Sequence, residues 1–349
     1  MQTDRVGDAT LYTGDVLDVL ATLPEESVHC VVTSPPYYAL RDYGVPGQIG
    51  LEETPEQYIA KMVEVFRAVR RVLRDDGTLW LNIGDSYAGS GRGPSGSNGF
   101  QNAEQRQGFT GGTDPRGPRR NKTDAPEGYK AKDLIGIPWM LAFALRADGW
   151  YLRSDIIWAK PNPMPESVTD RPTKAHEYLF LLSKSARYFY DAEAIREDGT
   201  TTRPELLAFG DRPDVDYPGH ADRRRSKKPD GWDTGAGGHG NHHRDGREHG
   251  EASEIRYGRN RRTVWTIATE PYPEAHFATF PRKLVQPCIL AGCPVGGTVL
   301  DPFGGSGTTA EVALEYGRRA ILVELKPEYV ELQKKRLEPV AGRPLLNFA

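Results

Sequence analysis

Short apolar runs alternate with helical patterns along most of the chain. Residues 28–32 form an apolar, β-branched run that predicts a buried strand. The helical pattern that follows has Thr54 as its N-cap, Pro55 in its first turn and Gly77 at its close. Residues 78–83 then predict a second strand. This alternation is typical of an α/β fold built on a largely parallel sheet.

The same alternation predicts the other elements. We expect Asp133 to cap the helix that begins there, and residues 176–182 to pair with residues 188–190. The pattern predicts further strands at residues 11–15, 152–158, 176–182, 188–190, 298–300 and 320–323, and helices at residues 16–23, 133–149, 281–292, 308–317 and from 327 onward.

Two long segments, residues 86–132 and 196–262, break the pattern with Gly, Ser, Asn and Pro. Between residues 92 and 132 there are eight Lys or Arg against four Asp or Glu. The second segment nearly balances its charges, fourteen basic against thirteen acidic, but gathers the basic ones in blocks. Such blocks fit either a solvated tail or an insertion that closes on a polyanion. Under the second interpretation the candidate contacts are Arg119, Arg120, Arg223, Arg224, Arg225, Lys227 and Lys228.

Composition narrows the protein class. The 349 residues carry a net charge of −3, so any nucleic-acid binding must come from local basic clusters. The odd set Cys30, Cys288 and Cys293 predicts a reducing compartment without a disulfide framework. No run of eighteen apolar residues occurs, and we expect a cytoplasmic protein without a membrane partner.

Five of the eight histidines lie within the second irregular segment. Their Gly-rich surroundings offer no strand or helix to fix ligand geometry, and no cysteine joins them. We therefore predict no metal site from these residues, which are His220, His239, His242, His243 and His249.

The strand at residues 28–32 ends in the turn Thr33, Ser34, Pro35, Pro36 and Tyr37. Two successive prolines cannot continue a sheet ladder, because neither has an N–H to donate. The turn therefore leaves spare carbonyls and an aromatic ring at the carboxyl end of a strand, where ligands bind in open α/β sheets. It suits a planar group that carries N–H donors, although a plain proline turn has the same residues.

A βαβ unit near the end of the chain has the features of a nucleoside-cofactor site. The loop Gly304-Gly305-Ser306-Gly307 follows a predicted strand, and Glu324 lies 20 residues beyond Gly304. The loop is not G-x-G-x-x-G and lacks a phosphate-binding Lys, which disfavours dinucleotides and nucleoside triphosphates. With Phe303 beside it, the loop favours S-adenosylmethionine.

These motifs together resemble the DNA amino-methyltransferases. The stretch from Asp301 to Thr308 resembles their cofactor motif, and the stretch from Thr33 to Tyr37 resembles their catalytic motif. The catalytic motif comes first, which resembles the β-group permutation. Gly14-Asp15, residues 77–85, His176-Glu177-Tyr178 and residues 276–281 also agree, and the resemblance covers residues 10–90, 133–192 and 275–337.

The resemblance implies a Rossmann-like, seven-stranded mixed sheet, circularly permuted, with an inserted target-recognition region. It implies a catalytic half at residues 1–85 and 133–195, a DNA-contacting loop at 86–132, a target-recognition insertion at 196–262 and a cofactor half at 263–349. Asp15 would contact the adenine of S-adenosylmethionine and Glu324 its ribose. The remaining cofactor residues that it implies are Thr279, Phe280, Pro281, Asp301, Phe303, Gly304, Gly305, Gly307 and Thr308.

The implied activity is site-specific methylation of double-stranded DNA. Ser34, Pro35, Pro36 and Tyr37 would hold the amine of a flipped base. Ser at position 34 goes mainly with cytosine N4 in that family and Asp with adenine N6, so we expect cytosine N4, with adenine N6 as the alternative. We expect a monomer or homodimer, with any cognate restriction endonuclease a separate chain.

Three other interpretations compete with this one. Cytosine C5 methylation needs a nucleophilic cysteine, and Pro287-Cys288 is a candidate, but its apolar neighbours indicate a buried thiol. A methyltransferase of RNA or of a small molecule is the second. The two long insertions, with their basic and aromatic residues, argue against a small substrate but leave RNA open. A DNA-binding protein without catalysis is disfavoured because both motifs are intact.

Overall fold

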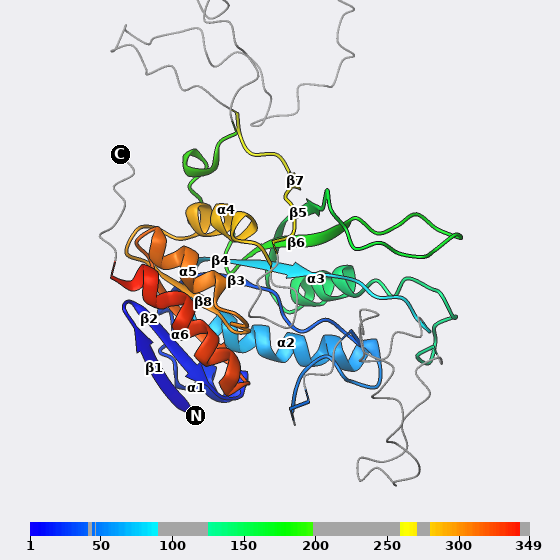
Figure 1. Cartoon of the computed structure of the whole chain (residues 1–349), viewed down its shortest axis with the longest axis horizontal. Coiled ribbons are helices and arrows are strands. Elements are labelled where there is room, and N and C mark those ends of the chain that lie inside the picture. Colours follow the sequence, from blue (N-terminus) through cyan, green and yellow to red (C-terminus); the bar gives the residue numbers. More distant parts are fainter. Residues whose placement is uncertain (41–43, 46, 90–124, 198–258, 271–279, 343–349) are drawn as a thin grey trace, which may run out of the picture. The chain divides into compact units, whose positions relative to one another are not determined.

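A nine-stranded sheet with helices on both faces forms the body of the protein (Figure 1). The computed structural model describes residues 1–40, 44–45, 47–89, 125–197, 259–270 and 280–342. The strands are β1 (Gln2–Val6), β2 (Ala9–Thr13), β3 (Val28–Thr33), β4 (Leu73–Ile83), β5 (Tyr151–Ala159), β6 (His176–Ser183), β7 (Val264–Thr266), β8 (Thr298–Asp301) and β9 (Arg319–Glu324).

The strand order is β1-β2-β9-β8-β3-β4-β6-β5-β7. Adjacent strands run parallel except where β1 pairs with β2 and where β6 pairs with β4 and β5. Strands β8 and β9 come last in the chain but lie between β2 and β3, as a permuted cofactor half requires. Without the short edge strands β1 and β7, the sheet is the seven-stranded mixed sheet that the sequence predicts.

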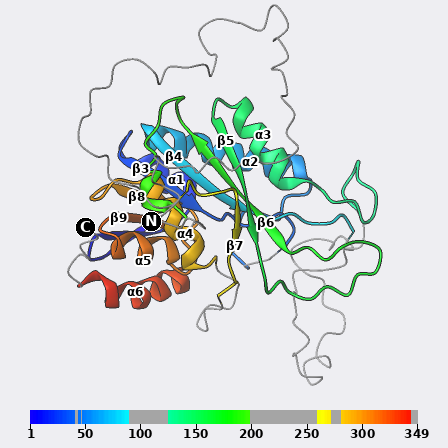
Figure 2. The same ribbon diagram turned by 90° about the horizontal axis from the view of Figure 1, so that it is seen from above.

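Six α-helices and one short 3-10 helix accompany the sheet within the described residues. They are α1 (Val16–Thr22), α2 (Pro55–Val72), α3 (Ile137–Ala147), η2 (Glu193–Ile195), α4 (Arg282–Gly292), α5 (Thr308–Glu315) and α6 (Pro327–Ala341). Helices α1, α2 and α3 cover one face, and α4, α5 and α6 the other (Figure 2). Central strand β3 is buried on both faces. Val31 belongs to the hydrophobic core under α1, α2 and α3, and Cys30 and Val32 belong to the core under α4, α5 and α6.

Three local predictions were wrong. Helix α2 begins as expected, because Thr54 Oγ1 accepts from the Gln57 N–H at 3.2 Å, but it ends at Val72, and β4 has already begun when the chain reaches Gly77. Residues 188–190 form no strand; the Phe189 N–H instead donates to the Asp76 carbonyl, and β6 already has neighbours on both sides.

The third concerns Asp133, which does not cap α3. Gly136 is the N-cap residue, and the Asp85 carboxylate accepts from the N–H groups of Gly136 and Ile137, each at 3.0 Å. Asp133 Oδ2 accepts from the Lys130 N–H in the preceding turn. The cap therefore comes from the end of β4, far away in the sequence, and ties α3 to the same sheet edge as the proline turn.

Residues 1–195 and 261–349 form one compact unit, and Arg196–Asn260 a second. In the second unit, an antiparallel bridge between Glu197 and Arg259 joins described residues near the two ends of the predicted target-recognition region. The basic residues predicted to contact DNA, the five histidines and Thr279 lie outside the described residues. Among the helices described here, none has the length and apolar character needed to cross a membrane.

Candidate active site

The proline turn and the glycine loop lie side by side because their strands do. Strand β3 pairs with β8 in parallel, so both strands end at the same edge of the sheet. The Asp301 carboxylate joins them: Oδ1 accepts from Thr33 Oγ1 at 2.7 Å and from the Phe303 N–H at 3.0 Å, and Oδ2 accepts from Thr309 Oγ1 at 2.7 Å. Burial raises the pKa of Asp301 to about 6, because it outweighs the opposite effect of these hydrogen bonds.

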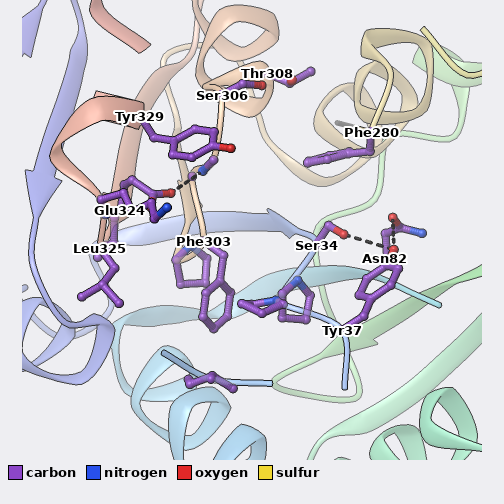
Figure 3. A pocket seen from close by; sticks show the side chains of 18 of the residues that line it. Ser34, Tyr37, Asn82, Phe280, Phe303, Ser306, Thr308, Glu324, Leu325 and Tyr329 are labelled. Carbon is purple, nitrogen blue, oxygen red and sulfur yellow. Dashed lines mark hydrogen bonds between the residues drawn. The ribbon is translucent and has the colours of Figure 1, made fainter. Parts of the chain in front are cut away.

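A cavity of about 660 Å³ runs along this edge and reaches both motifs (Figure 3). Ser34, Pro35, Pro36 and Tyr37 line one end of it. Of the predicted cofactor residues, Asp15, Phe280, Phe303, Gly304, Gly305, Thr308 and Glu324 line it too. Asp301, Gly307 and Pro281 are described but are not among its lining residues.

Four polar side chains meet at the catalytic end. Ser34 Oγ donates to the Tyr37 hydroxyl oxygen at 3.3 Å, and the Tyr37 hydroxyl lies 2.7 Å from Glu177 Oε2 and 3.1 Å from Asn82 Oδ1. Lys160 Nζ pairs with Glu177 Oε1 and lies 4.2 Å from the centre of the Trp158 ring. Burial, together with the Glu177 charge, raises the pKa of Tyr37 well above its usual value, so its hydroxyl stays protonated.

Contacts with α2 and with the end of β4 hold the proline turn in place. The Tyr58 hydroxyl donates to the Pro36 carbonyl at 2.9 Å, and Gly84 leaves room for the Tyr37 ring. A Cβ at Gly84 would stand 2.6 Å from Tyr37 Cε2, closer than side-chain atoms approach one another. The ring is therefore seated against the backbone that ends β4.

Glu324, at the end of β9, lines the other end of the cavity. Its Oε2 accepts from the Gly305 N–H and its Oε1 from the Lys326 N–H, each at 2.9 Å. Burial raises the pKa of Glu324 to about 7 despite these two bonds. Asp15 also lines the cavity, while its Oδ1 caps α1 by accepting from the Leu17 N–H at 2.8 Å.

The glycines of the loop are needed for packing as well as for access. Gly307 has φ +86°, and a Cβ there would meet Gln333 Cγ at 3.2 Å. A Cβ at Gly304 would meet both Gln333 Nε2 and Leu322 Cβ at 3.0 Å. Gln333, fully buried on α6, also donates from Nε2 to the Gly305 carbonyl at 2.8 Å.

No functional role was predicted for Asn82, Lys160, Glu177 or Gln333. Asn82 could have been found, since it lies near the end of a predicted strand beside the proline turn. Lys160 and Glu177 lie near the ends of two antiparallel neighbours, a pairing that no spacing in the sequence reveals. Gln333 lies on the buried side of an amphipathic helix, and no sequence pattern marks a glutamine there as part of a site.

Comparison with known proteins decides the family. A family model for N6/N4 methyltransferases, described as DNA methylase, matches residues 28–335. The chain belongs to this family. The type II methyltransferase M.Cfr9I of Citrobacter freundii is 45% identical over 334 residues, which cover 96% of this chain and 89% of that protein. M.SmaI of Serratia marcescens is 45% identical over 328 residues, covering 94% and 90%.

Solved structures show the same fold. The cytosine-N4-specific PvuII DNA methyltransferase has a TM-score of 0.57 at 18% identity, covering 98% of this chain and 96% of that one. A solved structure from Thermus thermophilus, complexed with S-adenosyl-L-methionine, has a TM-score of 0.53 at 22% identity, covering 97% of this chain and 99% of that one. The predicted Rossmann-like methyltransferase fold is confirmed. The protein is a DNA methyltransferase.

Cys288 is placed unfavourably for C5 methylation. Its thiol is fully buried in α4, donates to the Leu284 carbonyl at 3.2 Å and is not among the residues that line the cavity. Burial raises the pKa of this thiol, so the thiolate needed for attack on a base is disfavoured.

We expect the Cys288→Ala methyltransferase to keep at least half of the wild-type methylation rate, because the thiol only fills core volume. Incorporation of tritiated methyl groups into unmethylated phage DNA measures the rate, with thermal melting to compare folded fractions. Complete loss of turnover in a variant that melts like the wild type would restore the C5 hypothesis.

Proposed function

We propose that the enzyme transfers a methyl group to the exocyclic N4 of a cytosine in duplex DNA, at a specific site, as a type II modification methyltransferase. The choice of N4 rests on Ser34, which stands near the start of the turn and lines the same cavity as the glycine loop. PvuII methyltransferase is cytosine-N4-specific, but at 18% identity it supports the fold alone. The type II context is supported by M.Cfr9I and M.SmaI, which match over nearly their full lengths.

The chemistry proposed for the catalytic end follows from its donors and acceptors. A base must leave the duplex to reach this cavity, at a cost of a few kcal/mol. Stacking on Tyr37 would offset about 1–3 kcal/mol of that cost. Ser34 Oγ and the Pro35 carbonyl would accept the two amine hydrogens, so that the nitrogen lone pair is directed at the methyl donor. Ser34 is a weak base, so proton loss accompanies or follows methyl transfer.

The residues at the other end of the cavity fit S-adenosylmethionine. Phe303 and Phe280 give it aromatic walls, and the Glu324 and Asp15 carboxylates supply acceptors for hydroxyl and amine groups. When bound, the cofactor supplies an electrophilic methyl group on a sulfonium. In our proposal Glu324 accepts the ribose hydroxyls and Asp15 the adenine amine. The glycine loop, together with Phe280, would line the methionine end.

Cofactor affinity should depend on the protonation of Glu324. Because its pKa is about 7 and only the carboxylate accepts two hydroxyl hydrogens, we expect the Kd for S-adenosylmethionine to rise about tenfold from pH 8 to pH 6. Isothermal titration calorimetry at both pH values measures this ratio. The Glu324→Gln variant should bind more weakly at pH 8 and lose most of the pH dependence. An equal slope in the variant would contradict the assignment.

In this proposal, the two irregular segments with their basic clusters bind the duplex. The cavity edge holds one base, and a site-specific enzyme needs a far larger surface to select its sequence. Residues 86–132 and 196–262 interrupt the α/β pattern of the sequence and carry the Arg and Lys clusters predicted above. Restriction would be carried out by a separate endonuclease chain.

The test of the proposed function is the modified nucleoside. DNA from a host that lacks its own methyltransferases and expresses this chain is digested and examined by mass spectrometry. We expect N4-methylcytosine in the wild type and much less of it in the Ser34→Ala variant. N6-methyladenine alone would replace N4 with the adenine alternative. Single-molecule sequencing of the same DNA identifies the recognition site.

A further inference from the structure

We propose that Glu177 is a positioning residue that sets the direction of the hydrogen bonds beneath Ser34, so that the serine hydroxyl accepts from the target amine instead of donating to it. The inference rests on the proposed function, because it concerns how the same amine is held. Ser34, Tyr37, Asn82 and Glu177 all line the cavity, and they come from three neighbouring strands or their ends. Figure 3 shows the first three of them together.

The direction of the chain of hydrogen bonds follows from the groups around the Tyr37 hydroxyl. A carboxylate oxygen can only accept, and Glu177 Oε2 lies 2.7 Å away. Asn82 turns its Nδ2 toward the Tyr178 carbonyl, at 3.1 Å, which leaves Oδ1 facing the tyrosine at 3.1 Å. Within the described residues, both of these neighbours therefore accept, and Tyr37 must give its proton to one of them.

Ser34 is then left as the donor to Tyr37. Its Oγ lies 3.3 Å from the hydroxyl oxygen, whose lone pairs are available because its proton points toward Glu177 or Asn82. With its own proton committed to Tyr37, Ser34 offers lone pairs to the cavity. The opposite orientation would point the serine proton at the amine lone pair, which is the electron pair that must attack the methyl group.

Lys160 keeps Glu177 in this role. Its ammonium pairs with Oε1, opposite the oxygen that faces Tyr37, and the side chains of both members are only 17% exposed. The Trp158 ring fixes the ammonium from another side. Because Lys160 holds one oxygen, an amide at position 177 would also turn its oxygen to Lys160 and its NH₂ group to Tyr37. That substitution would place a donor where the network needs an acceptor.

The Glu177→Gln variant tests the proposal. We expect the single-turnover rate of methyl transfer to unmethylated phage DNA to fall about 20-fold, with the Kd for S-adenosylmethionine within twofold of wild type. The matched control is Glu166→Gln, which removes another carboxylate of similar burial, paired with Arg171 at 2.7 Å and not lining the cavity. The control should keep the wild-type rate.

A double-mutant cycle separates orientation from general damage. In the Tyr37→Phe background the network is already cut, so adding Glu177→Gln should lower the rate by less than twofold. An equal 20-fold loss in both backgrounds, or a wild-type rate for Glu177→Gln alone, would overturn the proposal. Product analysis keeps the two claims apart: N6-methyladenine from the wild type would refute the choice of cytosine, whereas the cycle reports on Glu177 whichever amine reacts.

Discussion

Replacing Ser34 with alanine is expected to lower the single-turnover rate of methyl transfer about a thousandfold, with the affinity for S-adenosylmethionine unchanged within twofold. The exocyclic amine is a poor nucleophile because its lone pair is delocalised into the ring. The hydroxyl of Ser34 would hold one amine hydrogen while the nitrogen becomes tetrahedral, an interaction that strengthens only as the methyl group is transferred. Removing one such aimed group typically costs about 10²–10³ in rate.

The test of Ser34 needs excess enzyme, tritiated S-adenosylmethionine and unmethylated phage DNA, so that product release does not limit the rate. Ser27→Ala is a suitable control, since that hydroxyl donates to the Pro24 carbonyl in a turn before β3 and does not line the cavity. A Ser34→Ala rate within tenfold of wild type would contradict the assigned role. Loss of cofactor binding in the same variant would point to a collapsed turn.

The second large effect concerns Asp301 and the pH dependence of stability. We expect the free energy of unfolding of the wild type to fall by about 2 kcal/mol relative to Asp301→Asn between pH 4.5 and pH 7.5. The folded-state pKa of Asp301 is about 6, above its ordinary value of 3.8, so the folded state holds the proton that the unfolded state has released. The stabilisation from that proton is present at low pH and is lost as the pH rises through 6.

Urea unfolding of both proteins across this pH range measures the difference, and subtracting the variant removes most titrations that the two share. Asparagine is a fair replacement because its Oδ1 can still accept from Thr33 and from the Phe303 N–H. Thr309 Oγ1 has the Val32 carbonyl within 3.3 Å as another acceptor. A pH-independent difference between the two proteins would show that Asp301 is already ionised at pH 4.5.

The central elements of the fold could be predicted because their signals are local. Residues 28–32 are apolar and end at two prolines, and Thr54 with Pro55 marks the start of α2. The cofactor loop could be predicted for the same reason, since Gly304 and Glu324 lie within one βαβ unit. The order of the two motifs then implied the permutation that places β8 beside β3.

What could not be predicted depends on contacts between distant segments. Helix α3 is capped by Asp85, not by Asp133, because the end of β4 lies next to its first turn. Strand β7 has only three residues, and nothing in their sequence says that they will pair with β5. Glu177 was visible as part of a motif, but its contact with Tyr37 exists only once β6 has paired with β4.

The most direct measurement of the central claim uses purified enzyme, S-adenosylmethionine with a deuterated methyl group and unmethylated phage DNA. Nucleosides from the reacted DNA are separated and identified by mass spectrometry. We expect deuterated N4-methylcytosine as the labelled product from the wild type, formed about a thousandfold more slowly by the Ser34→Ala variant. Label found only in N6-methyladenine or 5-methylcytosine would contradict this expectation.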